Sequence, residues 1–223
     1  MTSPPHDEVA PRRRGRPRLD DEMVPAVLDA AERLFSRRDS SDVGIRDIAA
    51  EAGIPHSAIY RYFDSKDQVL ARMLERGRQR QIEHDAVERS RGAGATGAFE
   101  WMMTNNRAYA IATMRAALAG QTPSTLGLDP ARSSARESIK AVEAGGTGLT
   151  VRTDHDPAVT IAATMAFVFG WVAAEDWILE STGLQECDRA DVHVELDSIL
   201  ESLAALGNGP RRVCGADEDA EHE

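Results

Sequence analysis

Apolar side chains recur at helical spacing in several separate stretches of this sequence. The first stretch begins at Asp20 and closes at Arg37 and Arg38, and its apolar positions share one helical face: Val24, Val27, Leu28, Ala31 and Phe35. Acidic residues open this stretch, where the positive end of a helix dipole favours them. No stretch shows the alternation of a strand, so the pattern predicts an all-α protein.

Two short helices are predicted next, from Ile45 to Ala52 and from His56 to Tyr62. Gly53 follows the first of them, and Pro55 opens the second. Glycine suits a left-handed helix end, and proline suits a helix start. Two short helices joined by such a turn form a helix-turn-helix, whose second helix enters the major groove of DNA.

The second short helix has the two faces that a groove-entering helix needs. Ile59 and Phe63 fall on the face that would pack on a core. The outward positions are His56, Ser57, Tyr60 and Arg61, with Tyr62 near the seam. Exposed tyrosines offer a flat apolar ring and a hydroxyl donor, which suit contacts with phosphates or bases.

The rear of the chain also has helical patterns. Ser65 and Gln68 form a capping-box pattern that opens a further helix. Later helices are predicted over 98–120, with a break at Thr104–Asn106, and over 130–144, 157–181 and 190–206. We expect four regions: a disordered basic arm (1–18), a three-helix head (19–74), a helical ligand-binding and dimerisation domain (75–206) and an acidic disordered tail (207–223).

Charge is distributed unevenly along the 223 residues, which carry a formal net charge of −11. Residues 1–80 hold 15 Lys and Arg against 14 Asp and Glu, whereas residues 81–223 hold 11 against 23. The acidity belongs to the rear, so net charge does not argue against an anionic partner for the front. Cys187 and Cys214 have no metal-like spacing, and no signal peptide is visible, which favours a reduced, cytoplasmic protein.

One apolar stretch, Val159–Ala174, resembles a membrane span. It has sixteen residues between Asp156 and Glu175, and a spanning helix needs about 20. A helix that is apolar all round is otherwise buried. We therefore expect a core helix or an oligomer interface, and no membrane partner.

The segment GIRDIAAEAGIPHSAIYRYFDSKDQVL, residues 44–70, resembles the DNA-binding head of the tetracycline-repressor (TetR) family of bacterial regulators. The resemblance runs from about Gly15 to Leu74 and implies a ligand-responsive repressor that binds a palindromic operator in double-stranded DNA as a dimer. It implies phosphate contacts from Arg46, Tyr60, Tyr62 and Lys66. His56, Ser57 and Arg61 would then contact bases.

The sequence departs from the family pattern at two places. Many members have Ser-Lys-Gly-Thr where this chain has residues 55–58, Pro-His-Ser-Ala, and a threonine cap where it has Gly44. A capping serine and a threonine that donates to phosphate are therefore missing. These differences predict an operator unlike that of better-known members.

The rear resembles the family only in its pattern of helices. The resemblance implies a homodimer through the last two helices, and small residues at helical spacing agree with a close helix contact: Ala163, Ala166, Gly170 and Ala174. It also implies an unknown small effector, which the composition suggests is apolar or amphipathic. Its predicted contacts are Trp101, Met102, Asn105, Tyr109, Met114, Phe167 and Trp171; Met103 and Asn106 are also candidates, and ordinary core packing is the alternative for all of them.

Other function classes have weaker support. Asp154–Asp156 is an acidic loop and a helix cap rather than a metal or acid/base cluster, and no nucleotide or nucleophile motif is present. We expect no enzyme activity, no metal and no cofactor. An architectural DNA-binding protein and a ligand-binding dimer that has lost specific DNA binding remain alternatives.

The run RRRGRPR, residues 12–18, holds five arginines in seven residues just before the first helix. Its Gly-Arg-Pro core resembles an AT-hook. Arginines in such an arm lie along a narrow minor groove beside a groove-reading helix. Arg14, Arg16 and Arg18 are therefore predicted to contact the minor groove, and a plain solvated tail is the alternative.

Overall fold

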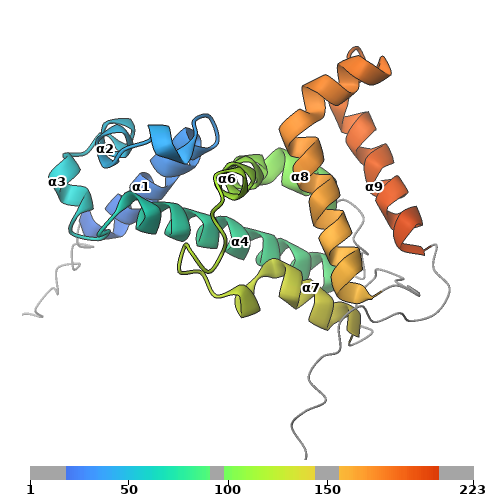
Figure 1. Ribbon diagram of the computed structural model, residues 1–223, viewed down its shortest axis with the longest axis horizontal. Coiled ribbons are helices and arrows are strands. Elements are labelled where there is room, and N and C mark those ends of the chain that lie inside the picture. The colour runs from blue at the N-terminus through green and yellow to red at the C-terminus, as the bar shows by residue number, and fades with distance from the viewer. Residues whose placement is uncertain (1–18, 91–97, 144–155, 206–223) are drawn as a thin grey trace, which may run out of the picture.

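The computed structural model describes residues 19–90, 98–143 and 156–205, and every regular element in these ranges is a helix (Figure 1). This confirms the predicted all-α class. The elements, in chain order, are α1 (Leu19–Phe35), η1 (Ser40–Asp42), α2 (Ile45–Ala52), α3 (His56–Ile59), α4 (Lys66–Ser90), α5 (Ala98–Asn105), α6 (Arg107–Leu118), η2 (Pro130–Arg132), α7 (Ser134–Glu143), α8 (Pro157–Thr182) and α9 (Arg189–Ala205).

The head is built from α1, α2, α3 and the first turns of α4. Its core contains side chains that are almost completely buried: Val27, Phe35, Ile48, Ile59, Phe63, Val69 and Met73. Ion pairs tie the helices together at the rim, where Glu32 of α1 accepts from Arg76 at 2.9 Å and from Arg80 at 2.6 Å. Burial of this apolar set fixes the orientation of the helices that follow it in the chain.

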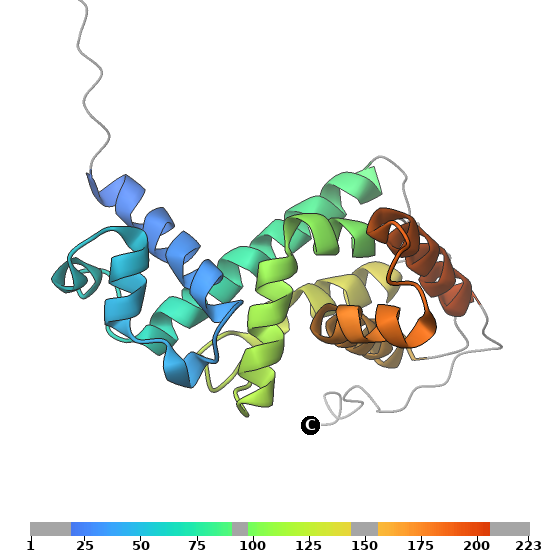
Figure 2. The same ribbon diagram turned by 90° about the horizontal axis from the view of Figure 1, so that it is seen from above.

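The head core is closed by a helix that lies far along the sequence. Ala112 and Ala116 of α6 are buried in the same cluster as the side chains of α1 and α4, and Tyr109 packs against it. Arg115 of α6 also pairs with Asp39, just before η1, at 2.5 Å. Figure 2 shows α6 crossing α4 between the head and α8. The 25-residue α4 and the crossing α6 therefore join the head to the body.

The body has a second, smaller core. It contains Phe99, Met103, Ala110, Trp171, Val172 and Leu179. Here α8 packs on α6 and α7, and α9 packs on α5. Asp197 of α9 contributes a polar contact, because its carboxylate accepts the backbone N–H of Phe99 at 3.1 Å and of Glu100 at 3.2 Å. This carboxylate satisfies donors at the start of α5 that have no partner within the helix.

The break predicted at Thr104–Asn106 is confirmed. α5 ends at Asn105, and α6 begins at Arg107, with Asn106 as the residue between them. Asn106 is 1% exposed and donates from Nδ2 to the backbone oxygen of Gly77 on α4 at 3.0 Å. The interruption of the apolar pattern thus marks a buried polar contact between α4 and the α5–α6 connection.

Two other predictions for the rear can be compared with the structure. The helix predicted over 130–144 is divided, because the Ser133 hydroxyl accepts the N–H of Arg136 at 3.2 Å and starts α7 after the short η2. The sequence predicts a core helix or an oligomer interface over Val159–Ala174, and in the single chain this stretch reaches the body core with Trp171 and Val172. α8 is long and apolar enough to span a membrane, but little of its apolar window is buried, and the oligomer interface stays a prediction. Asp156 caps α8, as predicted, by accepting the N–H of Ala158 at 2.8 Å.

Candidate nucleic-acid interface

The turn between α2 and α3 has the backbone of a helix-turn-helix. Gly53 adopts φ 69° and ψ 28°, in the left-handed region that favours glycine. The N–H of Ile54 then donates to the oxygen of Ala49 at 3.0 Å. Pro55 precedes the first residue of α3, where its missing N–H costs nothing. This turn directs α3 across α2 and toward the end of the molecule (Figure 1).

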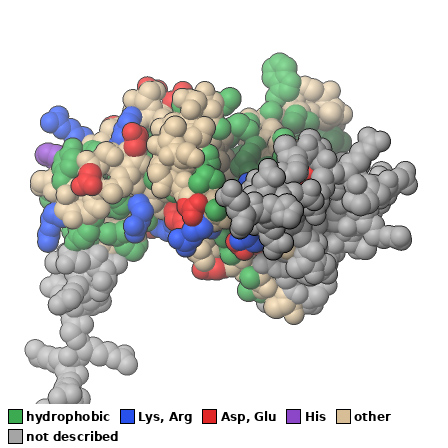
Figure 3. Space-filling view, turned by 60° about the horizontal axis from the view of Figure 1, so that its bottom comes forward, with side chains coloured by type: hydrophobic (Ala, Val, Ile, Leu, Met, Phe, Trp, Pro, Cys, Tyr) green, Lys and Arg blue, Asp and Glu red, His purple; other side chains and the backbone are tan. Residues whose placement is uncertain are grey.

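The core holds α3 by one face and leaves its other face outside. Ile59 is fully buried and Phe63 is 3% exposed, as the sequence pattern predicts. His56, Ser57 and Arg61 are exposed, and 56% of Tyr60 is exposed. Figure 3 shows Lys, Arg and His side chains at the outer end of the head. His56, Ser57, Tyr60 and Arg61 are therefore exposed on α3 and on the turn that follows it.

The helix itself is shorter than predicted. α3 ends at Ile59, and residues 60–62 form a turn rather than the end of a helix over His56–Tyr62. The N–H groups of Arg61 and Tyr62 donate to carbonyls three residues back, which tightens the last turn. Tyr62 is half-buried against the head core, and the Arg61 guanidinium lies 5.9 Å from the centre of its ring.

Lys66, the first residue of α4, is a half-buried member of the predicted set. Its ammonium donates to the backbone oxygen of Ser40, so it also ties α4 to η1. The predicted capping box is formed in part. Ser65 Oγ accepts the N–H of Gln68 at 3.1 Å, but the Gln68 side chain accepts from Asp64 at 2.6 Å rather than from Ser65. An ammonium has three donors, so Lys66 keeps donors for another acceptor.

The remaining predicted contacts lie at the start of α2 and before α1. Arg46 is exposed on the first turn of α2. Gly44, which stands where many members have a threonine cap, donates its N–H to Asp47 Oδ2 at 2.8 Å, and no side chain caps the start of α2. Arg14, Arg16 and Arg18 lie outside the described residues, and their role stays a prediction.

The comparison with known proteins concerns this same part of the chain. Residues 27–73 match the model of a family described as bacterial regulatory proteins, tetR family. The helix-turn-helix head is therefore similar to the DNA-binding part of tetR-family regulators. The matched residues include the turn at Gly53, all of α3 and the start of α4. They therefore cover the surface whose geometry is described above.

Three regulators from Mycobacterium tuberculosis are similar to this head. The chain is 43% identical over 54 residues to Rv1255c of Mycobacterium tuberculosis, an uncharacterized HTH-type transcriptional regulator. This match covers 24% of the chain and 27% of that protein. It is 42% identical over 65 residues to the regulator EthR, covering 29% and 30%. It is 38% identical over 63 residues to the HTH-type transcriptional repressor Rv3405c, covering 28% and 34%. The similarity thus spans about a third or less of each relative.

The predicted effector contacts do not gather in one place. Phe167 and Trp171 stack at 6.3 Å in the body core, with Met102 against that core. Trp101 instead stacks on His84 at the end of α4, with ring centres 4.2 Å apart. The others are spread along α5 and α6, where Asn105 is exposed, Met114 is half-buried and Tyr109 packs on the head core.

A buried charge cluster was not anticipated from the sequence. Glu175 of α8 is 3% exposed and binds His193 of α9 at 2.7 Å, Arg107 of α6 at 2.7 Å and Arg189 at 2.9 Å. Burial raises the pKa of Glu175, but the hydrogen bond from His193 and the charge of Arg107 outweigh it and hold the pKa below its usual range. The only signal in the sequence was an acid within an apolar helix.

Proposed function

We propose that this protein is a transcription regulator that binds a palindromic operator in double-stranded DNA as a homodimer. One observation supports the proposal above the others. The outer face of α3 is exposed and polar, while its rear face is fixed by Ile59 and Phe63 in the core of a TetR-like head. A helix held in this way can enter the major groove without rearrangement of the head.

In this proposal the DNA-contacting side chains make two kinds of contact. Arg46, Tyr60, Tyr62 and Lys66 bind backbone phosphates and set the register of the head on DNA. The base-reading side chains are on or just after α3: His56, Ser57 and Arg61. Arg14, Arg16 and Arg18 follow the adjoining minor groove, which gives a preference for A·T pairs beside each half-site.

The dimer is proposed to form through α8 and α9. Both helices leave apolar side chains in solvent, among them Met165 (38% exposed), Trp177 (77%) and Val194 (55%). Exposed apolar area on this scale marks a contact with another molecule. A second copy that covers this face places two heads about a two-fold axis, so that they meet successive major grooves. We propose this second copy, rather than a membrane, as the partner of α8.

Regulation is proposed to come from a small apolar or amphipathic effector that binds the body and releases the operator. The protein is proposed to act in the cytoplasm as a repressor. The effector would favour an arrangement of the heads that does not fit DNA. By linkage, DNA and effector weaken each other's binding by the same factor. The contacts of α6 with both cores support a mechanical link between the two binding functions.

The proposal is tested by capture of fragments from the source genome at physiological salt. A regulator retains tight binding to a few fragments that share a two-fold symmetric sequence. An architectural protein loses most of its affinity for all fragments as salt rises. Recovery of no enriched sequence by a folded dimer would reject the regulator and favour a dimer that has lost specific DNA binding.

A further inference from the structure

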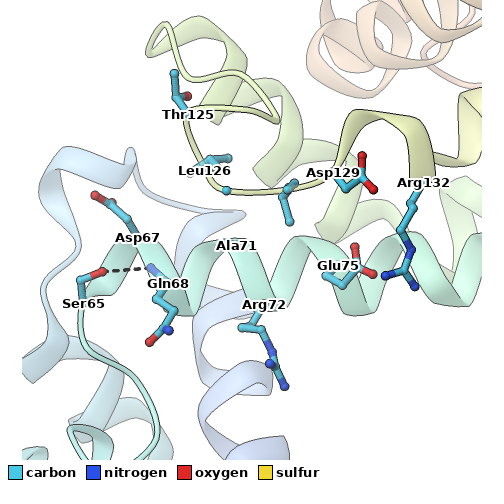
Figure 4. Close-up of a pocket in the computed structure, with 12 residues that line it drawn as sticks. Ser65, Asp67, Gln68, Ala71, Arg72, Glu75, Thr125, Leu126, Asp129 and Arg132 are labelled. Atoms are coloured by element: carbon cyan, nitrogen blue, oxygen red, sulfur yellow. Dashed lines mark hydrogen bonds between the residues drawn. The ribbon is translucent and has the colours of Figure 1, made fainter.

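A groove of about 610 Å³ lies between the first turns of α4 and the segment that connects α6 to α7 (Figure 4). One wall is formed by residues of the start of α4, and the other by residues of the connecting segment: Ser65, Asp67, Gln68, Ala71, Arg72 and Glu75, and Thr125, Leu126, Gly127, Leu128, Asp129 and Arg132. None of the residues predicted to read DNA or to contact the effector lines it. The groove is therefore a separate feature, located where the head meets the body.

The floor of the groove is apolar and fixed in place. Ala71 of α4 is 8% exposed, and Leu126 and Leu128 of the connecting segment pack against the head core. Gly127 between the two leucines adopts φ 69°, which bends the segment so that both leucines lie against the core. An apolar floor held by core packing offers a preformed contact surface for a hydrocarbon group.

One end of the groove has an excess of positive charge. Glu75 is held by Arg78, whose Nε donates to its carboxylate at 2.7 Å, and Arg78 also donates to the backbone oxygen of Arg132. Arg72 and Arg132 line the groove near this pair. The Arg132 side chain extends toward Glu75, whereas the Arg72 side chain extends from α4 away from the connecting segment (Figure 4). The hydrogen bond from Arg78, together with the charges of Arg78, Arg132 and Arg72, holds the pKa of Glu75 below its usual range in spite of burial. The charges of three arginines thus act on the Glu75 carboxylate.

The other acidic groups along the groove leave a single net positive charge at this end. Asp129 lies near Arg132, so three arginines here face the carboxylates of Glu75 and Asp129 (Figure 4). Asp129 caps η2, where its carboxylate accepts the N–H of Ala131 at 2.9 Å. Asp67 lies at the opposite end, in the first turn of α4, with Leu126 between it and Arg132 (Figure 4). A ligand that fits this distribution has an anionic group at the Arg72 and Arg132 end and an apolar body on the floor.

We propose that this groove binds an amphipathic organic carboxylate. Arg132 holds the carboxylate, and arginine is suited to this because its planar fork can donate two parallel hydrogen bonds. The exposed Arg72 turns its side chain toward the ligand and adds a second positive charge. The hydrocarbon part lies on Ala71, Leu126 and Leu128. A bound ligand bridges α4 and the α6–α7 connection, so it fixes the first turns of α4 relative to the body. The site is additional to the DNA surface and to the proposed effector site.

The test is titration calorimetry of the full chain with octanoate, in the absence of DNA, so that its result is independent of the operator. Octanoate is expected to bind saturably, and octylammonium, which has the same chain and the opposite charge, is not. Arg132→Ala and Arg72→Ala should each weaken octanoate binding by about tenfold or more. Arg136→Ala is the matched control, because Arg136 is an exposed arginine on α7 that does not line the groove.

The charge-reversed variant Arg132→Glu separates this site from any other site for the probe. It should lose octanoate binding, with its helical circular dichroism unchanged, since the Arg132 side chain is exposed. Absence of octanoate binding to the wild-type chain would overturn the proposal. Octanoate binding that Arg72→Ala, Arg132→Ala and Arg132→Glu all retain at full strength would overturn it as well, because the probe would then occupy a different place.

Discussion

The ring of Tyr109 lies directly against the backbone of Gly77, at the point where α6 crosses α4. A Cβ added at Gly77 would lie 2.4 Å from Cδ2 of Tyr109, which is too close for any side chain. Asn106, three residues before Tyr109, donates to the Gly77 oxygen at 3.0 Å. The absence of a side chain at Gly77 thus permits the close crossing that joins the head to the body.

Substitution of this glycine should separate the two helices. Gly77→Ala is expected to lower the free energy of unfolding by about 1–3 kcal/mol through overpacking. Alanine is otherwise favoured over glycine in a helix by about 1 kcal/mol. In a Tyr109→Gly background, which also removes the Cβ that would lie 2.8 Å away, the same change should therefore be neutral or stabilising. Urea denaturation of the four proteins measures this cycle, and an equal loss in both backgrounds would contradict the packing described here.

The stability of the body should depend on pH through Glu175. Because its folded pKa lies below the usual range, its contribution is present above the unfolded value of about 4.3 and is lost as pH falls through the folded value. Glu175→Gln should lower the free energy of unfolding at pH 7 by about 1.5–3 kcal/mol. The free energy of unfolding of this variant should also decrease less than that of the wild type as pH falls.

Glu180→Gln is the control for this experiment, since Glu180 is exposed on the same helix. Thermal unfolding followed between pH 3 and pH 7 distinguishes the two variants. If both show the same pH profile as the wild type, the buried cluster does not stabilise the body as the contacts indicate.

The sequence predicted local features well because their causes are local. The left-handed turn at Gly53, the interruption before α6 and the cap at Asp156 each depend on a few adjacent residues. Partners far apart in the chain could not be predicted in this way. Nothing local links Arg115 to Asp39, or Glu175 to His193.

The same limit explains the scatter of the predicted effector contacts. Helical spacing shows that Tyr109 and Trp171 face a protein core, but it does not show whether that core belongs to the head or to the body. In the structure Tyr109 packs on the head core and Trp171 lies in the body core. The groove residues Arg72 and Arg132 were missed because charged residues on a helix or a loop have no periodic signal.

Two phosphate contacts are expected to differ in their effect on folding. Tyr60→Phe removes one hydroxyl from a side chain that is 56% exposed, so DNA binding should weaken by about 3-fold to 30-fold with no change in stability. Lys66→Ala also removes the bond to the Ser40 oxygen, so it should reduce both DNA affinity and stability. Fluorescence anisotropy with an operator and an unrelated duplex, together with thermal melts, separates the two effects. Wild-type affinity in both variants would exclude them as phosphate contacts.

The proposed dimer predicts a specific role for Trp177. This side chain is 77% exposed on α8, so Trp177→Ala should raise the dimer dissociation constant by tenfold or more if it is buried by a second copy. Leu118→Ala is the control, because Leu118 is 79% exposed on α6, away from the proposed interface. Sedimentation equilibrium without detergent measures both. A monomeric wild-type chain, or a need for detergent, would contradict a dimer through α8 and α9.

Selection from a random duplex pool, with the wild type and with an Arg61→Ala variant, tests whether α3 reads DNA. We expect the wild type to enrich a two-fold symmetric sequence, with half-sites about one helical turn apart. The variant should relax the preference at one position in each half-site, at a cost of about 1–3 kcal/mol in affinity for the wild-type sequence. Enrichment of no common sequence by the folded wild type would contradict base reading by α3. So would enrichment of the unchanged wild-type sequence by each of the variants Arg61→Ala, His56→Ala and Ser57→Ala.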